Sequence, residues 1–299
     1  MVNMEISCNN FKSVARALTI VENNLNGSGD LLKNLSYKKH VPVIGVTGPP
    51  GAGKSTLVNG IINELVNQNL KVAVLAIDPT SPFNFGSLLG DRIRMAHHFN
   101  NPNVYIRSLA TRGSLGGLSV KTIEMADVLK AAGFDYIIVE TVGVGQSEVE
   151  IAGLADLTMV VLVPESGDEI QNIKSGLMEI ANAFVVNKAD RPGAEEFINN
   201  LKKLTHHHTP PIPVFRAEAT ANVGITALVD FIKSFKVDQS LRKPFLLTEK
   251  AYHLIQEKQM AAIDKKKLQQ AIATALKEDN DFNIYRFADQ YLNKQVRNS

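Results

Sequence analysis

The motif at residues 48–55 constrains the fold of this chain more than any other feature. Its letters, GPPGAGKS, match the phosphate-loop pattern GxxxxGK[ST]. An apolar run, Val41–Thr47, precedes the motif, and Leu57, Ile61 and Leu65 follow it at helical spacing. A strand, a glycine-rich turn and a helix start are the context in which such a loop binds a polyphosphate. The sequence therefore predicts a nucleotide-binding α/β domain.

Each part of the loop has a chemical task. The glycines let backbone N–H groups turn inward around phosphate oxygens, and the helix start adds the positive end of its dipole. Lys54 can reach the β- and γ-phosphates, and the Ser55 hydroxyl can ligate Mg²⁺. The residues of the loop that we expect to contact the nucleotide are Gly48, Pro50, Gly51, Ala52, Gly53, Lys54, Ser55 and Thr56.

Seven apolar runs alternate with helical patterns between residue 41 and about residue 237. Runs such as Tyr136–Val139 are apolar at every position, which is typical of strands covered on both faces. The sequence thus predicts a doubly wound, mostly parallel sheet of the phosphate-loop NTPase type, with its ligand at the carboxyl ends of the strands. The predicted strands are Val41–Thr47, Lys71–Ile77, Val104–Ser108, Tyr136–Glu140, Leu157–Val163, Phe184–Asn187 and Pro213–Arg216.

Three domains are predicted along the chain. Residues 1–40 form a helical extension, residues 41–237 form the nucleotide-binding domain, and residues 238–299 form a helical arm. In the arm, one helix is expected over about 248–263, and two more carry the apolar residues listed at the end of this paragraph. Three short helices cannot bury their apolar faces alone, so they pack either on the core or on a second subunit. These apolar residues are Leu268, Ile272 and Leu276, then Ile284, Phe287 and Leu292.

Composition narrows the class of protein. The 299 residues are 44% hydrophobic and 21% charged with a net charge of +2, so no basic excess points to nucleic acid. The single cysteine, Cys8, excludes an internal disulfide and suits a reducing compartment. No apolar run approaches the ~20 residues of a membrane span, and the start lacks an export signal. We expect a cytoplasmic protein with neither a membrane nor a nucleic acid as partner.

A second motif selects the base. Asn187, Lys188 and Asp190 belong to the tetrapeptide NKAD at the end of an apolar run. The Asp190 carboxylate can accept hydrogen bonds from N1–H and the exocyclic amine of guanine, a donor pair that adenine lacks on that edge. Asn187 can address guanine N7 and the loop backbone, while the stem of Lys188 covers the ring. Downstream of a phosphate loop, this motif favours GTP over ATP.

Acidic residues at strand ends complete the candidate site. Glu140 and Gly143 lie in the sequence ETVG, in the place of a DxxG motif, where the acid can hold a Mg²⁺-bound water and the Gly143 amide can sense the γ-phosphate. Asp78 and Asp91 either approach Mg²⁺ or only form a turn and cap a helix. Position 144 is valine rather than a water-orienting glutamine, which predicts slow intrinsic hydrolysis. The candidate catalytic residues are Lys54, Glu140 and Asp91, and the candidate metal ligands are Ser55, Asp78, Asp91 and Glu140.

Taken together, these motifs resemble the methylmalonyl-CoA mutase-associated GTPases, the MeaB/ArgK group. The resemblance rests on GPPGAGKST at 48–56, RGSLGGLS at 112–119, VETVGVGQSE at 139–148, GDEIQNIKSGLMEIA at 167–181 and NKAD at 187–190. A long run at 78–95 and RALTIVEN at 16–23 also match. Together these stretches span most of residues 11–236.

The resemblance implies a homodimeric GTPase, joined through helical arms, that gates cofactor delivery to an adenosylcobalamin-dependent acyl-CoA mutase and protects that enzyme. Segment 167–176 would relay the nucleotide state to the mutase. One departure is Glu218-Ala219 where the family usually has Ser-Ala, which leaves the backbone amide of Ala219 to contact guanine O6 by analogy. The alternatives are an ATPase or kinase associated with lysine, arginine and ornithine transport, and a metallochaperone GTPase.

Overall fold

A computed structural model describes most of the chain, in two compact units, 1–246 and 247–299. The residues described are 5–78, 95–110, 120–141, 147–166, 175–236, 247–248, 251–252, 254–256, 259–260, 263–278 and 281–297. Unit 1 holds the sheet and the helices that cover it, and unit 2 is helical.

Unit 1 is built on a seven-stranded sheet whose order is β3-β2-β4-β1-β5-β6-β7, with every neighbouring pair parallel. The parallel, doubly wound sheet predicted from the apolar runs is therefore confirmed, and each predicted strand lies within two residues of an observed one. The strands are β1 (Val43–Thr47), β2 (Val72–Asp78), β3 (Val104–Ala110), β4 (Tyr136–Glu140), β5 (Leu157–Leu162), β6 (Ala183–Val186) and β7 (Val214–Arg216).

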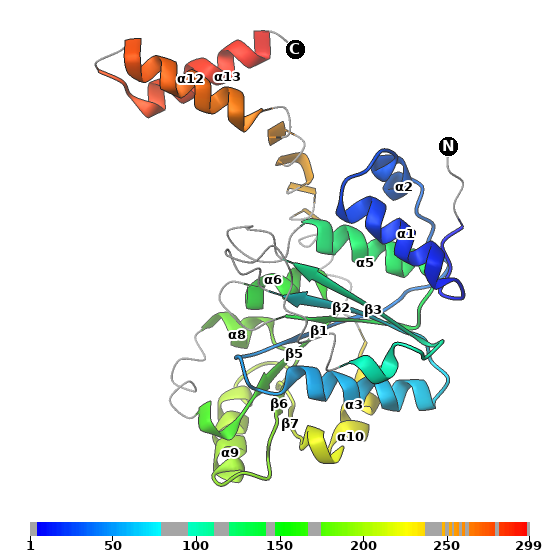
Figure 1. Cartoon of the computed structure of the whole chain (residues 1–299). Coiled ribbons are helices and arrows are strands. Elements are labelled where there is room, and N and C mark those ends of the chain that lie inside the picture. The colour runs from blue at the N-terminus through cyan, green and yellow to red at the C-terminus, as the bar shows by residue number, and fades with distance from the viewer. Residues whose placement is uncertain are drawn as a thin grey trace. The chain divides into compact units, whose positions relative to one another are not determined.

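Helices cover both faces of the sheet (Figure 1). One face packs against α3 and α10, and the other packs against α1, α5 and α6, with α8 and α9 at the β5–β7 end. Short 3₁₀ helices occur at Ala96–His98 (η1), Pro164–Ser166 (η2) and Ala219–Ala221 (η3). The helices of unit 1 are α1 (Phe11–Glu22), α2 (Ser28–Lys33), α3 (Lys54–Asn67), α5 (Val120–Ala132), α6 (Ser147–Leu154), α8 (Ser175–Ile180), α9 (Ala194–Thr205) and α10 (Ile225–Ser234).

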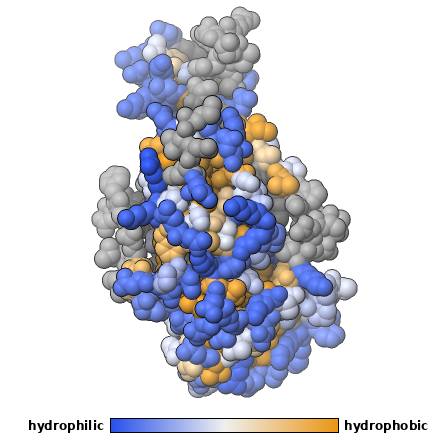
Figure 2. Space-filling view, turned by 90° about the vertical axis from the view of Figure 1, so that its right-hand side faces the viewer, coloured by the Kyte–Doolittle hydropathy of each residue, from blue (hydrophilic) through white to orange (hydrophobic). Residues whose placement is uncertain are grey.

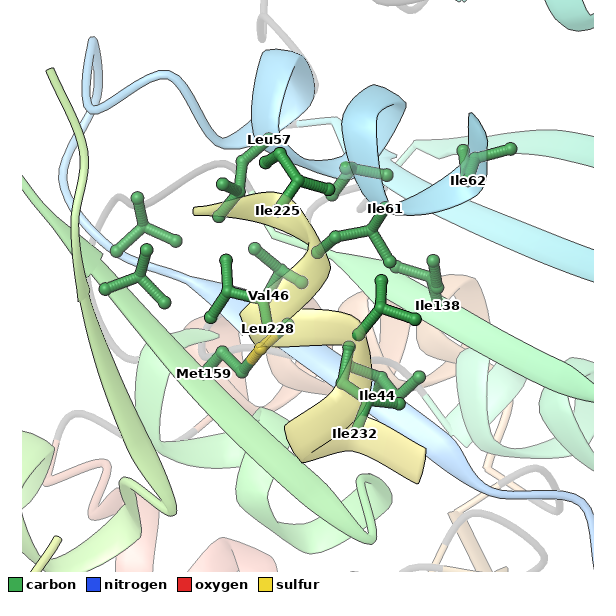
Figure 3. Close-up of a cluster of buried hydrophobic side chains, with 14 of the residues drawn as sticks. Ile44, Val46, Leu57, Ile61, Ile62, Ile138, Met159, Ile225, Leu228 and Ile232 are labelled. Atoms are coloured by element: carbon green, nitrogen blue, oxygen red, sulfur yellow. The ribbon is translucent and has the colours of Figure 1, made fainter. Parts of the chain in front are cut away.

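The period of two along each strand divides the core between these faces. In β1, Ile44 and Val46 point to the α3 and α10 side, whereas Val43 points to the α1 and α5 side. Figure 3 shows Leu57 and Ile61 of α3, together with residues of α10, closing over Ile44, Val46 and the adjacent strands. Because both faces are buried, the strands read as continuous apolar runs.

The N-terminal extension forms part of this core. Val14, Leu18 and Val21 of α1 are fully buried in the cluster that contains α5, and the Arg107 guanidinium on β3 pairs with the Glu22 carboxylate at the end of α1. Leu25 continues the helical spacing of Val14, Leu18 and Val21 in the sequence, but it is 49% exposed because α1 ends at Glu22 and the chain turns. The helix begins at Phe11, where the Asn10 side chain accepts a hydrogen bond from the Ser13 amide.

Unit 2 carries two amphipathic helices, α12 (Lys265–Glu278) and α13 (Ile284–Arg297). The Asp264 carboxylate caps the start of α12 by accepting hydrogen bonds from the amides of Lys266 and Lys267. No residue of α12 is buried, and Leu276 is 56% exposed. The apolar side of α12 is thus only partly covered within the described part of the unit, with Leu268 and Ile272 half-buried.

Candidate functional site

Four connections of the sheet meet at one edge, because parallel strands bring their carboxyl ends together. The phosphate-loop sequence follows β1, Glu140 ends β4, Asn187 follows β6, and Ala219 follows β7. Since β1 lies between β4 and β5, its loop occupies the centre of this edge. The sequence predicted these positions separately, and the fold brings them to one place.

The phosphate loop has a backbone that only glycine adopts readily. Gly48 has φ +137°, and a Cβ there would lie 2.0 Å from the Val161 carbonyl oxygen on β5, so a larger residue cannot be accommodated. Gly53 has φ +84° and is the N-cap of α3 without a side-chain cap. Because glycine provides no capping side chain, no side chain at the N-cap competes with an anion for the first-turn amides of α3.

Lys54 is 7% exposed, and its ammonium group folds back over the loop. Its Nζ donates to the carbonyl oxygens of Gly48, at 2.8 Å, and Pro49, at 3.0 Å. Buried ammonium groups require such partners, and here the partners are the carbonyls of the loop itself. These two hydrogen bonds hold the positively charged ammonium group inside the loop.

Ser55, at the start of α3, and Glu140, at the end of β4, form a polar contact at this edge of the sheet. The Ser55 hydroxyl donates to Glu140 Oε1 at 2.6 Å, and each residue is 6% exposed. Above them, the Thr141 hydroxyl donates to the Thr47 hydroxyl at 2.9 Å, and the Thr141 amide donates to the Val46 carbonyl. The threonine pair was not predicted, although two polar residues following adjacent buried strands are a signal that could have indicated it.

Asn187 joins three connections with one amide group and is 2% exposed. Its Nδ2 donates to the Ala52 carbonyl at 2.9 Å, and its Oδ1 accepts a hydrogen bond from the Ala219 amide at 3.1 Å. The amide dipole is therefore used at both ends, once by the phosphate loop and once by the loop after β7. This arrangement was not anticipated in detail, because sequence spacing does not indicate which loops meet.

The other residues of NKAD surround this junction. Lys188 adopts φ +55°, and its Nζ donates to the Gly51 carbonyl at 2.7 Å. Asp190 is exposed, whereas Ala189 and Ala219 are buried at 5% and 6% exposure. A hydrogen bond from the Arg191 side chain lowers the pKa of Glu165, which begins the connection after β5.

Arg216 is a residue at this edge that sequence reasoning missed. Its guanidinium contacts the Ala189 carbonyl and the side chains of Glu218 and Glu195. The available signal was weak: Arg216 and Glu218 are two positions apart at a strand end and therefore project to the same side.

Some predicted site residues lie outside the described part of the chain. Gly143 and Asp91 are among them, and Asp78 is described only as the last backbone position of β2. Their assignments stay predictions. Within the described residues, no group of three or more His, Cys, Asp and Glu side chains is placed to hold a metal ion. None of the described helices is both long enough and apolar enough to cross a membrane.

A family model and several known proteins are similar in sequence to this chain. The family described as methylmalonyl Co-A mutase-associated GTPase MeaB matches residues 14–277. A protein named as a GTPase in Pyrococcus horikoshii is 41% identical over 95% of this chain and 94% of its own. The mouse protein named methylmalonic aciduria type A homolog, mitochondrial, is 39% identical over 64% of this chain and 48% of its own length.

Among solved structures, the crystal structure of a LAO/AO transport system kinase is similar to this chain. Its TM-score is 0.64 at 26% sequence identity, and the match covers 96% of this chain and 93% of that one. The similarity to that protein thus extends well beyond the phosphate loop.

Proposed function

Because the chain belongs to the family of methylmalonyl-CoA mutase-associated GTPases, we propose that it is a GTP-dependent chaperone of an adenosylcobalamin-dependent acyl-CoA mutase. It would regulate cofactor loading and protect the loaded enzyme, with both partners in the cytoplasm. The observation that carries the proposal is the family match over residues 14–277. It is supported by a site in which Asn187, after β6, is hydrogen-bonded both to the phosphate loop and to the loop after β7. Guanine nucleotide binding follows from membership of the family, and the residue roles are our assignment.

In this assignment the phosphates lie on the amides of residues 48–56 and the α3 start, with Lys54 as the principal counterion. Its buried ammonium already contacts the loop carbonyls, so it stays close to the position that a phosphate would take. Asp190 reads the guanine N1–H and amine, and the Ala219 amide meets O6. The Gly143 amide would sense the γ-phosphate.

The residues present fit a magnesium ion. Ser55 and Glu140 present hydroxyl and carboxylate oxygens 2.6 Å apart, the hard donors that Mg²⁺ prefers. Ser55 would ligate the ion, Glu140 would hold one of its waters, and Asp78 and Asp91 are the further candidates. A bound Mg²⁺ would neutralise charge on the β- and γ-phosphates. We assign Lys54 and Glu140, with Asp91, as the candidate catalytic residues.

A nucleotide-dependent pull-down tests the proposed partner. The tagged full-length chain is incubated with native lysate in the presence of GTP, of GDP or of no nucleotide, and an acyl-CoA mutase should be retained in one nucleotide state. The Lys54→Ala variant is the control, since it should lose nucleotide binding by at least about 100-fold, judged from truncation of other buried charged partners. Equal recovery of the mutase in every state, or no recovery at all, would contradict the chaperone role.

We further propose that hydrolysis by the isolated chain is slow and is accelerated by the partner. Val144 stands where a water-orienting glutamine is common, and residue 144 itself lies outside the described part of the chain. Single-turnover measurements with and without the mutase test this statement. Rapid hydrolysis without a partner would be inconsistent with it.

A second candidate is an ATPase or kinase associated with amino-acid transport, because a structural relative is titled a LAO/AO transport system kinase. Base preference separates the two candidates. If the chain is a GTPase chaperone, Asp190→Asn should reduce the preference for GTP over ATP, because the amide can no longer accept both guanine hydrogen bonds. Equal binding of ATP and GTP by the wild-type chain would favour the transport candidate.

We also propose that residues 1–40, 41–237 and 238–299 act as extension, GTP-binding domain and dimerisation arm. Support comes from α12, whose apolar side is only partly covered in the described part of unit 2, where Leu276 is 56% exposed. A homodimer joined through such arms would bury that side.

A further inference from the structure

We propose that Arg216 is a positioning residue for guanine recognition, which joins the loop that carries Asp190 to the loop that carries Ala219. The inference rests on the proposed nucleotide site and adds a residue that determines its specificity. Arg216 ends β7, directly before the Ala217–Ala219 segment and opposite the turn of NKAD.

The guanidinium contacts both loops at once. Arg216 Nη2 donates to the Ala189 carbonyl at 3.2 Å and to Glu218 Oε1 at 3.0 Å. Its Nη1 donates to Glu195 Oε1 on α9 at 2.7 Å. A planar guanidinium can hold several acceptors in a fixed arrangement, which an ammonium group cannot do.

The contact with Ala189 fixes the backbone that leads to Asp190. The Ala189 amide donates to the Ala217 carbonyl at 3.1 Å, and this bond holds the peptide plane before Ala189. The Ala189 carbonyl belongs to the next peptide plane, whose other end is the nitrogen of Asp190. With Arg216 holding that carbonyl, both peptide planes around Ala189 are tied to the β7 end, so the direction of the Asp190 side chain is constrained.

The contact with Glu218 addresses a charge that guanine would otherwise meet. Glu218 precedes Ala219, the residue whose amide we assign to guanine O6, and the Glu218 side chain is 21% exposed. A carboxylate beside an acceptor oxygen is repulsive unless a cation compensates it. Arg216 supplies that cation and holds the carboxylate on its own side. The acidic residue at this position is thereby made compatible with an O6 contact.

The fold itself depends little on this ion pair. The Arg216 side chain is 48% exposed, and ion pairs between exposed groups contribute little to stability. Substituting Arg216 should therefore leave the chain folded, while it alters the geometry of two loops that contact the base. This difference allows a positioning role to be distinguished from a structural one.

The test compares the affinity for GDP with that for inosine diphosphate, which lacks the exocyclic amine assigned to Asp190. Calorimetry on the full-length chain gives the ratio for wild type, Arg216→Ala and Arg216→Lys, and thermal melting reports on folding. Arg286→Ala is the matched control, because Arg286 is also an exposed arginine in an ion pair, with Asp281 at 3.1 Å, in the other unit.

We expect Arg216→Ala to lower the GDP-to-inosine-diphosphate ratio by about threefold to tenfold, the size of one solvent-accessible charged contact. Arg216→Lys should lower the ratio as well, since lysine keeps the charge without the planar contact, and Arg286→Ala should not change it. An unchanged ratio in every folded Arg216 variant would overturn the inference. If wild type does not bind GDP, the proposed nucleotide site fails instead.

Discussion

At the scale of single residues, the Asn187 amide is the centre of the candidate site. Its side chain is 2% exposed, and both its Nδ2 and its Oδ1 are hydrogen-bonded, so neighbouring residues have little room to change position. One of them is Gly53, where a Cβ would lie 2.4 Å from Asn187 Nδ2. The requirement for glycine at position 53 therefore comes from Asn187, which follows β6, as well as from the phosphate loop.

The first prediction follows from this contact. Gly53→Ala should destabilise the fold by about 1–3 kcal/mol more than Gly193→Ala, because it displaces a buried, hydrogen-bonded amide. Gly193 is a matched control: it is also the N-cap of a helix, with φ +82° against +84°, and a Cβ there would meet nothing within 4 Å. Denaturant unfolding of both variants measures the difference. Equal losses would show that only backbone conformation matters.

A second prediction concerns His98, which is 3% exposed and lies against His97 with ring centroids 4.1 Å apart. Burial, and then the neighbouring His97, lower the pKa of His98 from 6.5 to about 4. The unfolded chain thus takes up this proton at a higher pH than the native chain does. The contribution of His98 is complete above pH 6.5 and is lost as the pH falls from 6.5 toward 4.

Unfolding free energies at pH 7 and pH 5 measure this effect. The wild type should lose about 1–3 kcal/mol more than His98→Leu over that interval, since leucine cannot take up a proton. His97→Gln, at an exposed position, is the control and should keep most of the pH dependence. An identical pH dependence in wild type and His98→Leu would rule out His98 as its source.

At the scale of elements, the strands were the most predictable part of the fold. Their continuous apolar runs, such as Tyr136–Val139, identify strands buried on both faces, and their ends differ from the observed ends by at most two residues. Helix ends were less predictable, because local turns decide them: Leu25 follows the apolar period of α1 but lies beyond its end. The spacing of apolar residues indicates which side of a helix is buried, but it does not indicate the residue at which the helix ends.

The third prediction tests α1 as part of the core. Leu18→Ala should destabilise unit 1 by about 2–5 kcal/mol, because the side chain is fully buried against α5 and leaves a cavity. Leu25→Ala removes the same atoms from a side chain that is 49% exposed and should cost no more than about 0.5 kcal/mol. Thermal or denaturant unfolding distinguishes the two. Similar costs would mean that α1 is not integral to the sheet cover.

At the scale of the whole molecule, the sequence motifs identified the loops that form the candidate site. The order of the strands in the sheet determined which of these loops contact one another. Gly48–Ser55, Glu140 and NKAD could be predicted because each follows an apolar run in a recognisable pattern. The Asn187 junction and the Arg216 contacts could not, since they depend on residues brought together by β6 and β7. Hydrophilic residues interrupt the hydrophobic ones over the face shown in Figure 2, so that view does not single out one large apolar area.

The fourth prediction concerns the two units. All three buried clusters lie within residues 6–235, so a chain that ends at residue 246 should keep its fold and its affinity for GDP. If α12 and α13 form the dimer arm, that shortened chain should be monomeric while the full chain is dimeric. Sedimentation measures the mass of both. A dimer that survives removal of residues 247–299 would place the interface in unit 1.

The two hydrogen bonds made by the Asn187 side chain have a kinetic consequence. The Asn187 side chain holds the phosphate loop against the loop after β7, and both hydrogen bonds are made between residues of the chain itself. Little conformational entropy then remains to be lost when guanine enters. Capture of the purine should accordingly proceed at an encounter-limited rate, without a slow isomerisation step.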